Sequence, residues 1–439
     1  MKINSQIMKR LFYSAILVVC ACSVYAQDVY NLKRCIEIGL QQNYDIRIIR
    51  NEQLISDNNR TLANAGYLPT VDLNAGYSGT LNNTEQKLTS GEKNKNSNIN
   101  NQNLNAGVNL SWTVFDGFKI QTNYNRLKEL QQIGEINTRI TIENFIADLS
   151  TEYYNYIQQS IRLNNLKSAV KLSRERLRIV EARYQIDYQQ AKVDFNADSS
   201  RLIQQYEVLF TSRVQLNELM SVQDVEQQVL LADTLINYNP LLNREDIWAK
   251  VQLSNSLMKL TQHSMRLSEL DLKNVLSQNY PYLKLNAGYG YTRNIYDTGN
   301  YDWQQTMGLS YGVTLGMNLF NGNRKRQKRN AKLEIENRRL ETEQLELSIK
   351  TSLANMWMAY QNNMQLVNLE KENVETANAN YDIAIDRYKL GDLSGIELRE
   401  AQNSLLAAEE RLVQSMYSTK LCEISLNQLS GQIISYTGY

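Results

Sequence analysis

Four segments of the chain alternate between apolar and polar residues, and each predicts a β-strand with two different faces. In one of them Leu104, Val108 and Trp112 fall on one face, whereas Asn, Gly, Ser and Thr occupy the alternate positions. A side-chain period of two, sustained over about ten residues, is typical of a strand in a two-faced sheet. The pattern predicts strands at about 70–80, 103–115, 282–292 and 307–320.

The four strands belong to an internal duplication. The pentapeptide LNAGY occurs at Leu73–Tyr77 and again at Leu285–Tyr289. The later blocks VFDG and LFNG, and then RYQIDYQQA and RYKLGDLSG, follow in the same order. Matched blocks in a fixed order indicate two structural repeats, each expected to run helix, strand, strand, long helix, turn and helix. We place the first repeat at 27–220, an inter-repeat linker at 221–243 and the second repeat at 244–439.

Long helices are expected to follow the second strand of each repeat. From Asn323 to Leu390 the chain contains neither proline nor glycine, which allows roughly 100 Å of uninterrupted helix at 1.5 Å per residue. Apolar residues recur there at alternating spacings of three and four, the seam pattern of a coiled coil. In the helix that returns, leucines such as Leu398 and Leu405 form one seam row, and small residues such as Ala401 form the other. Small residues permit a close approach, so we expect tightly packed helical hairpins.

The N-terminal segment has the composition of a secretory signal peptide. Lys2, Lys9 and Arg10 precede an apolar run, and small or apolar residues lead up to Ala26. This order of basic, apolar and small residues is typical of a cleavable export signal, and Cys22 leaves lipidation as a less favoured alternative. No other stretch contains the roughly 18 apolar residues of a membrane helix. We therefore expect a signal peptide at 1–26 and no helical anchor.

Export changes the interpretation of the strands. They are about twice as long as the five or six residues usual in soluble proteins, and this length with a polar second face suits a strand that crosses a membrane. Four strands cannot close a barrel, because about eight are needed and lipid excludes open sheet edges. The sheet is therefore either soluble or shared among several chains, and we favour the shared barrel. The Asn-rich stretch 80–103 suits an exposed extracellular loop.

The residues that carry most protein chemistry are scarce. His263 is the only histidine, so a multi-histidine metal site is excluded. A hydrolase would need a nucleophile beside His263, which lies in a polar helical stretch and is expected to be a surface residue. Cys35 and Cys422 follow the signal peptide; a disulfide between them is possible in an oxidising compartment, although the seam position of Cys422 favours a small buried thiol. We expect no cofactor, no metal and no enzymatic activity.

One segment stands out by its charge. With 47 basic and 46 acidic residues the chain is nearly neutral, yet NRKRQKR at 323–329 places five cations directly after the fourth strand. Such a run is compatible with nucleic-acid binding, but export makes that interpretation the poorer one. We expect no nucleic-acid partner and favour a solvated or juxtamembrane collar.

Together these features resemble the TolC family of outer-membrane efflux proteins, also called outer-membrane factors. The resemblance covers the mature chain and rests on NLKRCIEIGLQQNYDIR, AGYLPTVDLNAGYSG, the VFDG and LFNG junctions and RYKLGDLSGIELREAQNSL. It implies a mainly α-helical fold with a transmembrane β-barrel portion: a homotrimer with a shared 12-stranded barrel and an α-helical periplasmic tunnel. The implied function is a passive exit duct of a tripartite efflux or type I secretion system, in the outer membrane and extending into the periplasm.

The resemblance also implies the partners of such a duct. These are a periplasmic adaptor (a membrane fusion protein), an inner-membrane pump of the RND (resistance–nodulation–division) or ABC type, and outer-membrane lipid. An alternative from a different class is a periplasmic coiled-coil structural or adaptor-like protein with a soluble sheet domain. That alternative explains the helices but gives no reason for four long strands.

The helical turns at 184–193 and 388–397 are the expected periplasmic tips. Gly391 can adopt the positive φ that ends a helix, and Ser394 followed by Glu397 is a capping-box pattern. The resemblance implies that these turns dock the adaptor. The residues concerned are Gly391, Asp392, Leu393 and Ser394 in the second turn and Asp187, Tyr188 and Gln189 in the first. Asp187 stands where the family has a glycine, so the first turn matches less well.

A constriction of the tunnel is implied next to the second turn. Glu397 and Glu400, three residues apart on one helical face, match acidic positions of the family, and Tyr388 matches a tyrosine of its closed gate. In a trimer the two glutamates would form rings of negative charge that repel anions and bind cations. Leu393 stands where some members carry a gate arginine, so an arginine-based lock is not expected there.

Overall fold

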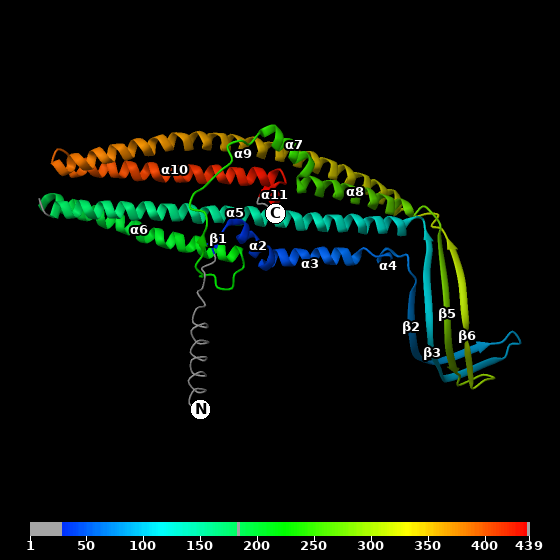
Figure 1. Ribbon diagram of the computed structural model, residues 1–439. Coiled ribbons are helices and arrows are strands. Elements are labelled where there is room, and N and C mark those ends of the chain that lie inside the picture. The colour runs from blue at the N-terminus through cyan, green and yellow to red at the C-terminus, as the bar shows by residue number, and fades with distance from the viewer. Residues whose placement is uncertain (1–28, 182–184, 437–439) are drawn as a thin grey trace, which may run out of the picture. The chain divides into compact units, whose positions relative to one another are not determined.

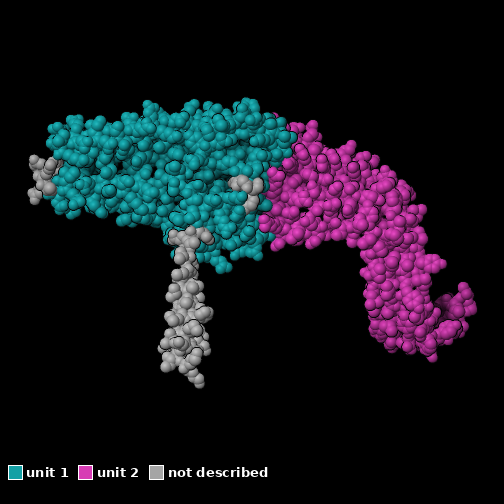
Figure 2. All heavy atoms as spheres, in the orientation of Figure 1, with its two compact units in different colours: residues 1–47, 141–255, 351–439 teal, residues 48–140, 256–350 magenta. Residues whose placement is uncertain are grey.

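The structure is a computed structural model that describes residues 29–181 and 185–436 (Figure 1). The expected signal peptide at 1–26, with Cys22, lies outside these residues. The chain divides into two compact units, shown in Figure 2. We call them the helical unit, Met1–Arg47 with Thr141–Asn255 and Thr351–Tyr439, and the sheet unit, Ile48–Ile140 with Ser256–Lys350. Each unit takes residues from both halves of the sequence.

The sheet unit contains an antiparallel sheet of four strands in the order β2-β3-β5-β6. The strands are β2 (Thr70–Lys87), β3 (Lys93–Asp116), β5 (Tyr282–Ile295) and β6 (Trp303–Gly316). Apolar positions are aligned across all four strands, because Val108 lies opposite Leu73 on one side and Tyr289 on the other. Tyr289 in turn lies opposite Leu309. The two LNAGY segments therefore flank the same strand from opposite sides.

None of the segments that the structure describes covers the apolar face of this sheet. Leu73 is 78% exposed and Leu309 is 67% exposed. Strands β2 and β6 are exposed along almost their whole length, and each is hydrogen-bonded to a neighbouring strand on one side only. Burial of apolar surface is the dominant favourable contribution to folding, so this face requires a cover from outside the single chain.

The hairpin between β2 and β3 is longer than the sequence pattern predicted. The stretch 80–103, expected as a loop, continues as paired strands, and the turn is confined to 88–92. Its pairs are polar, such as Thr80 with Asn101, and the ladder shifts register beside Asn98, whose φ is 59°. Backbone pairing does not require an apolar face, so these strands carry no apolar alternation in the sequence. At the other edge, β6 ends at Gly316, before the expected boundary at 320.

Helices lie before and after the strands in each repeat. The preceding helices are α3 (Tyr44–Asn59), α4 (Leu62–Ala65) and α8 (Ser256–Ser277), and the following ones are α5 (Lys119–Glu181) and α9 (Asn323–Leu390). At 68 residues, α9 is about 100 Å long, which confirms the uninterrupted helix expected after LFNG. Within the described ranges, none of the helices combines the length and the apolar character required to cross a membrane.

The two strand-to-helix junctions differ in their need for glycine. Gly117, in VFDG, has φ 71°, and a Cβ at this position would collide with the backbone carbonyl of Ser277 in α8. Asp116 starts α5 by accepting a hydrogen bond from the backbone N–H of Ile120 at 3.0 Å. Gly322, in LFNG, has no positive φ, and a Cβ there would meet only the Phe320 ring at 4.0 Å. Only the first junction therefore requires glycine.

The helical unit has one main apolar core. Besides parts of α5 and α9 it contains α2 (Leu32–Gln42), α6 (Gln185–Leu219), α7 (Arg244–Ser254), α10 (Gly395–Leu429) and α11 (Ile433–Tyr436). Fully buried members of the core include Ile36, Ile146, Leu216, Ile424 and Ile433. The segment 221–243, expected as a linker, also contributes: Val229 and Ile236 are buried in the core, and β4 (Leu230–Leu231) pairs in parallel with β1 (Val29–Tyr30).

A buried polar cluster joins this segment to the C-terminal helices. The carboxylate of Glu423 accepts hydrogen bonds from Lys420 Nζ at 3.2 Å, from the Tyr436 hydroxyl at 2.6 Å and from the backbone N–H of Asn239 at 3.0 Å. Burial lowers the pKa of Lys420, although Glu423 acts in the opposite direction. The carboxylate thus has three donors, and it links α10, α11 and the inter-repeat segment.

Cys35 and Cys422, the two cysteines among the described residues, are free thiols. Cys35 is completely buried, and this burial raises the pKa of its thiol to about 12. Cys422 is half-buried, with Asn363 Nδ2 at 3.7 Å from its sulfur. The disulfide that the sequence left open is not formed.

Candidate functional site at the helical turns

Local hydrogen bonds close the turn between α9 and α10. Gly391 has φ 89°, and the N–H of Asp392 donates to the carbonyl of Arg387 at 3.0 Å, the left-handed helix end that glycine favours. Ser394 caps α10, because the N–H of Glu397 donates to Ser394 Oγ at 3.3 Å and the N–H of Ser394 donates to the Glu397 carboxylate at 2.9 Å. Both halves of the predicted capping box are present.

An apolar cluster lies directly behind this turn. Its buried members come from α9 and α10 and are Tyr381, Ala384, Leu398, Ala401 and Leu405. Tyr388 and Leu393, two of the predicted site residues, pack against the cluster and are half-buried. Leu390 and Ile396, in contrast, are strongly exposed on either side of the turn. The turn therefore has a buried apolar base and exposed apolar flanks.

The two predicted acidic residues have different surroundings. Glu397 and Glu400 are both exposed on α10, while Leu398 and Ala401 beside them face the core. Hydrogen bonds from the backbone and side chain of Ser394 hold the pKa of Glu397 below its usual value. Glu397 thus contributes to the N-terminal cap of α10, and any further role must be compatible with its hydrogen bonds to Ser394.

The first turn, between α5 and α6, is described only in part. Residues 182–184 and the side chain of Asp187 lie outside the described residues. Tyr188 is half-buried, with Lys192 Nζ 5.8 Å from its ring centre, and Gln189 is exposed. Figure 1 shows this turn and the second turn at the same end of the long helices.

One turn into α10 lies a buried ionic network that the sequence patterns did not single out. Arg399 donates to both carboxylate oxygens of Asp198 on α6, at 2.5 and 2.8 Å. Such bidentate, charge-assisted pairs are among the strongest hydrogen bonds in proteins. Ser173 of α5 donates to the same carboxylate, and Gln402 donates to Ser173 Oγ at 3.1 Å. The network therefore joins three helices of the two hairpins.

Burial makes this network sensitive to the loss of a partner. Asp198 is 1% exposed and Arg399 is 13% exposed. Burial by itself would raise the pKa of Asp198, but the hydrogen bonds from Arg399 and Ser173 outweigh that effect and hold its pKa below the usual 3.8. A second ion pair, Arg176 with Asp194, lies beside it and also joins α5 to α6.

The sequence did contain a signal for this network. Asp194 and Asp198 are four residues apart, and Ser173 and Arg176 are three apart, so each pair lies on one helical face. Charged residues that share a face with apolar seam residues require partners. Arg399 lies between Leu398, a seam residue, and Glu400, an expected tunnel residue, so neither of those two patterns points to it.

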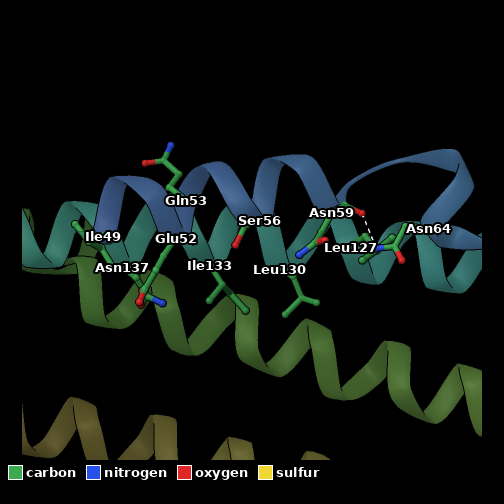
Figure 3. A pocket seen from close by; sticks show the side chains of 11 residues that line it. Ile49, Glu52, Gln53, Ser56, Asn59, Asn64, Leu127, Leu130, Ile133 and Asn137 are labelled. Atoms are coloured by element: carbon green, nitrogen blue, oxygen red, sulfur yellow. Dashed lines mark hydrogen bonds between the residues drawn. The ribbon is translucent and has the colours of Figure 1, made fainter. Parts of the chain in front are cut away.

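The groove in Figure 3 lies between α3 and α5 in the sheet unit. It measures about 350 Å³, and Glu52 is the one ionisable side chain among its lining residues. Ser56 points toward α5, where a Cβ on Gly134 would come within 3.1 Å of Ser56 Oγ, so glycine permits the close approach of the helices. A single carboxylate among amides and leucines provides no acid–base pair, and we interpret the groove as a packing feature.

His263 has a specific partner. Its Nδ1 lies 2.7 Å from Glu129 Oε2, and both side chains are about four-fifths buried, so the surface position expected for this histidine was wrong. Among the residues that the structure describes, no group of three or more His, Cys, Asp or Glu side chains gathers as a metal site.

Comparison with known families identifies the class of protein. The family model described as "Outer membrane efflux protein" matches residues 36–221 and 251–432, which together make up most of the chain. The chain therefore belongs to the outer membrane efflux protein family. The two matched regions correspond to the two halves that carry the repeated blocks. No protein with a curated functional description was found to match the sequence.

Solved structures with the same fold are outer-membrane channels. The CmeC channel of Campylobacter jejuni is 15% identical, with a TM-score of 0.76 over 91% of this chain and 85% of that one. VceC of Vibrio cholerae is 16% identical, with a TM-score of 0.73 over 91% and 96% of the two chains. The open-state MtrE channel of Neisseria gonorrhoeae is 15% identical, with a TM-score of 0.74 over 92% and 89%. These likenesses establish the fold.

The family and fold-class predictions are confirmed. The protein is a mainly helical member of an outer-membrane efflux channel family, with a sheet contributed by both halves of the chain. Its location in the outer membrane and its role in efflux follow from the family. This is a family of channel proteins rather than of enzymes.

Proposed function

We propose that three copies of this chain form a passive efflux duct, in which three four-stranded sheets close one twelve-stranded barrel. The observation that carries the proposal is the sheet itself, with an apolar face exposed and with unpaired edges at β2 and β6. Lipid can cover the face but cannot satisfy unpaired backbone groups. An edge β6 that pairs with β2 of the next copy removes every open edge.

The helices support the same assembly. Apolar side chains on the outer surfaces of α6 and α9, such as Ile203 and Ile383, are strongly exposed in the single chain. Exposed apolar patches of this kind mark protein contacts. Neighbouring copies would cover them and enclose the periplasmic tunnel.

The turns are proposed to dock a periplasmic adaptor, which links the duct to an inner-membrane pump of the RND or ABC type. Gly391, Asp392 and Ser394 are exposed, and the exposed Leu390 and Ile396 beside them offer apolar anchors. In the first turn the docking residues are Asp187, Tyr188 and Gln189. The pump supplies the energy, and the chain itself is proposed to have no catalytic activity, as expected of a member of a family of channel proteins.

Glu397 and Glu400, with Tyr388 behind the turn, are proposed to form the narrowest part of the tunnel. Their exposure on α10 leaves both carboxylates accessible to passing ions. Three copies would place six carboxylates around one axis, which favours cations over anions.

Membrane fractionation followed by mass determination of the detergent-extracted particle tests the assembly. A trimer found in outer membranes is the expected result. A soluble monomer or dimer in the periplasmic fraction would reject the duct and leave the coiled-coil structural protein as the better interpretation.

Single-channel recording tests the constriction. The double variant Glu397→Gln with Glu400→Gln should lose cation selectivity and change conductance, because it removes the charge while glutamine still completes a capping box. Glu375→Gln with Glu372→Gln removes two carboxylates from α9, away from the turn, and should leave both properties unchanged. Equal effects of the two pairs would argue against a constriction at Glu397 and Glu400.

A further inference from the structure

The start of α9 carries a dense cluster of positive charge. Six of the ten residues at 323–332 are cationic and none is acidic. We call them the basic collar: Arg324, Lys325, Arg326, Lys328, Arg329 and Lys332. The matching stretch after the first strand pair, 118–127, has two cations. A strand-to-helix junction therefore does not need the collar in order to fold.

Among the described residues, most of the collar has no hydrogen-bond or ion-pair partner. Arg324 donates to Asn279 Oδ1 and to the carbonyl of Asn318, both at 2.9 Å. The other five side chains are exposed, and along α9 the ion pairs found within the described residues begin only at Glu334. The first turn of α9 contains no acidic residue, although the N-terminal end of a helix carries partial positive charge. Five unpaired cations at that end favour an anion from outside the chain.

An apolar hollow lies beside the collar. It measures about 550 Å³ and is lined by Val275 and Leu276 of α8, by Leu319 and Phe320, and by Lys325 and Lys328. Leu319 is 86% exposed and Phe320 is 88% exposed. An apolar floor next to ammonium groups suits a ligand that has both a hydrocarbon chain and an anionic group.

The hollow continues the apolar row of the sheet. Leu309, Val313 and Leu315 occupy alternate positions of β6, and the same period of two leads through Met317 to Leu319. Side chains of a helix tilt toward its N-terminus, so the lysines and arginines of the collar extend toward the sheet. A row of apolar residues that ends in cations is the arrangement found where hydrocarbon gives way to lipid headgroups.

We propose that the basic collar and the hollow bind an anionic phospholipid of the membrane leaflet that faces the periplasm. The collar contacts the phosphodiester, and an acyl chain lies along Leu319 and Phe320. The inference rests on the proposed function, since it requires the sheet to stand in the membrane and the helices to extend into the periplasm. Such a site ties the end of the strands to the headgroup level of the bilayer.

Native mass spectrometry of the detergent-purified protein, with equal amounts of phosphatidylglycerol and phosphatidylethanolamine added, tests the proposal. The wild type should retain phosphatidylglycerol in preference. Lys325→Gln with Lys328→Gln should weaken the binding of phosphatidylglycerol roughly 30-fold. Each lysine near an anionic surface contributes about 1 kcal/mol, and about 1.4 kcal/mol corresponds to a tenfold change in affinity. The matched control, Lys350→Gln with Lys371→Gln, removes two charges from α9 beyond the collar and should keep the preference.

Further variants and ligands distinguish a phospholipid site from a site for a free anion or for a second copy of the chain. Lys325→Arg with Lys328→Arg keeps the charge and should keep the lipid, whereas glycerol phosphate, which lacks a hydrocarbon chain, should bind weakly. Phe320→Ser should reduce retention of both lipids. Equal binding of the two lipids by the wild type would overturn the proposal. The proposal would also fail if Phe320→Ser disrupted the oligomer but left the ratio of the two bound lipids unchanged. That result would mean that a second copy of the chain, and not a lipid, covers the hollow.

The same spectra report the mass of the particle, so the two proposals fail separately. A trimer without a preference for phosphatidylglycerol would overturn the lipid site alone. A particle that is never larger than a monomer would overturn the proposed duct.

Discussion

Replacing Arg399 with alanine should loosen the helices beside the turns. The change removes both hydrogen bonds from Arg399 to Asp198, a carboxylate that is 1% exposed. Removing one partner of a buried ion pair typically costs 3–5 kcal/mol. Asp198 keeps its hydrogen bond from Ser173, and Arg201 remains at 3.9 Å. We therefore expect the lower end of that range, about 3 kcal/mol.

Hydrogen exchange measures this loss where it occurs. Backbone amides of α6 and α10 around the network exchange through local opening, whose equilibrium constant depends on the free energy of that region. A loss of about 3 kcal/mol corresponds to roughly 150-fold faster exchange. The protection of the core around Ile146 and Ile424 should change much less, because those residues lie outside the network.

Two further variants decide whether the buried charge is the cause. Arg338→Ala breaks exposed ion pairs with Glu334 and Glu341 on α9 and should cost less than about 1 kcal/mol. Adding Asp198→Asn to Arg399→Ala removes the orphaned charge and should restore part of the protection. If the double variant exchanges as fast as Arg399→Ala, or if Arg338→Ala has an equal effect, the reasoning from buried charge is refuted.

Three other predictions use the same structure. The pKa of Asp198 in the folded protein lies below its usual 3.8. The ionised carboxylate therefore stabilises the fold fully above about pH 3.8, and this stabilisation is lost as the pH falls toward the folded-state pKa. Hydrogen exchange near α6 should show the loss in the wild type and not in Asp198→Asn. Gly117→Ala should lower the free energy of unfolding of the purified particle by about 2 kcal/mol or more, because a left-handed alanine costs roughly 1–2 kcal/mol and its Cβ would also collide with the carbonyl of Ser277. Gly322→Ala should change the same free energy by less than about 0.5 kcal/mol. Equal effects of the two variants in thermal unfolding would show that the backbone at Ser277 moves to accept the Cβ. Ser394→Ala should cost about 1 kcal/mol, seen as faster exchange in the first turn of α10, and unchanged exchange would mean that the capping box is not needed.

Much of the fold was predictable because periodic patterns reflect burial. Apolar alternation located the four strands, and the absence of glycine and proline located α9. The Asn-rich hairpin was missed because its strands pair through the backbone and polar side chains, which leave no apolar period. The repeat boundaries predict a linker at 221–243, but Val229 and Ile236 of this segment are part of the main core.

The candidate site at the helical turns was likewise predictable only in part. The turn at Gly391 and the cap at Ser394 follow from local rules and were found. The pair of Arg399 with Asp198 joins residues 201 positions apart, and a single sequence does not show which distant charges meet. The roles of Tyr388, Glu397 and Glu400 depend on symmetry-related copies and stay predictions.

The extended hairpin of β2 and β3 has a practical consequence. Strand β3 is paired with β5 only from Gln102 onward, so its first part and β2 form a two-stranded ribbon. At the tip, Gly91 has φ 90° and no neighbour within 4 Å of a Cβ. An affinity tag inserted there would lengthen an exposed turn and should leave the paired strands β2 and β3 in place. In living cells, antibody access to that tag would show which side of the envelope the ribbon faces, and a fluorescent label on it would follow single channels without touching the conduit.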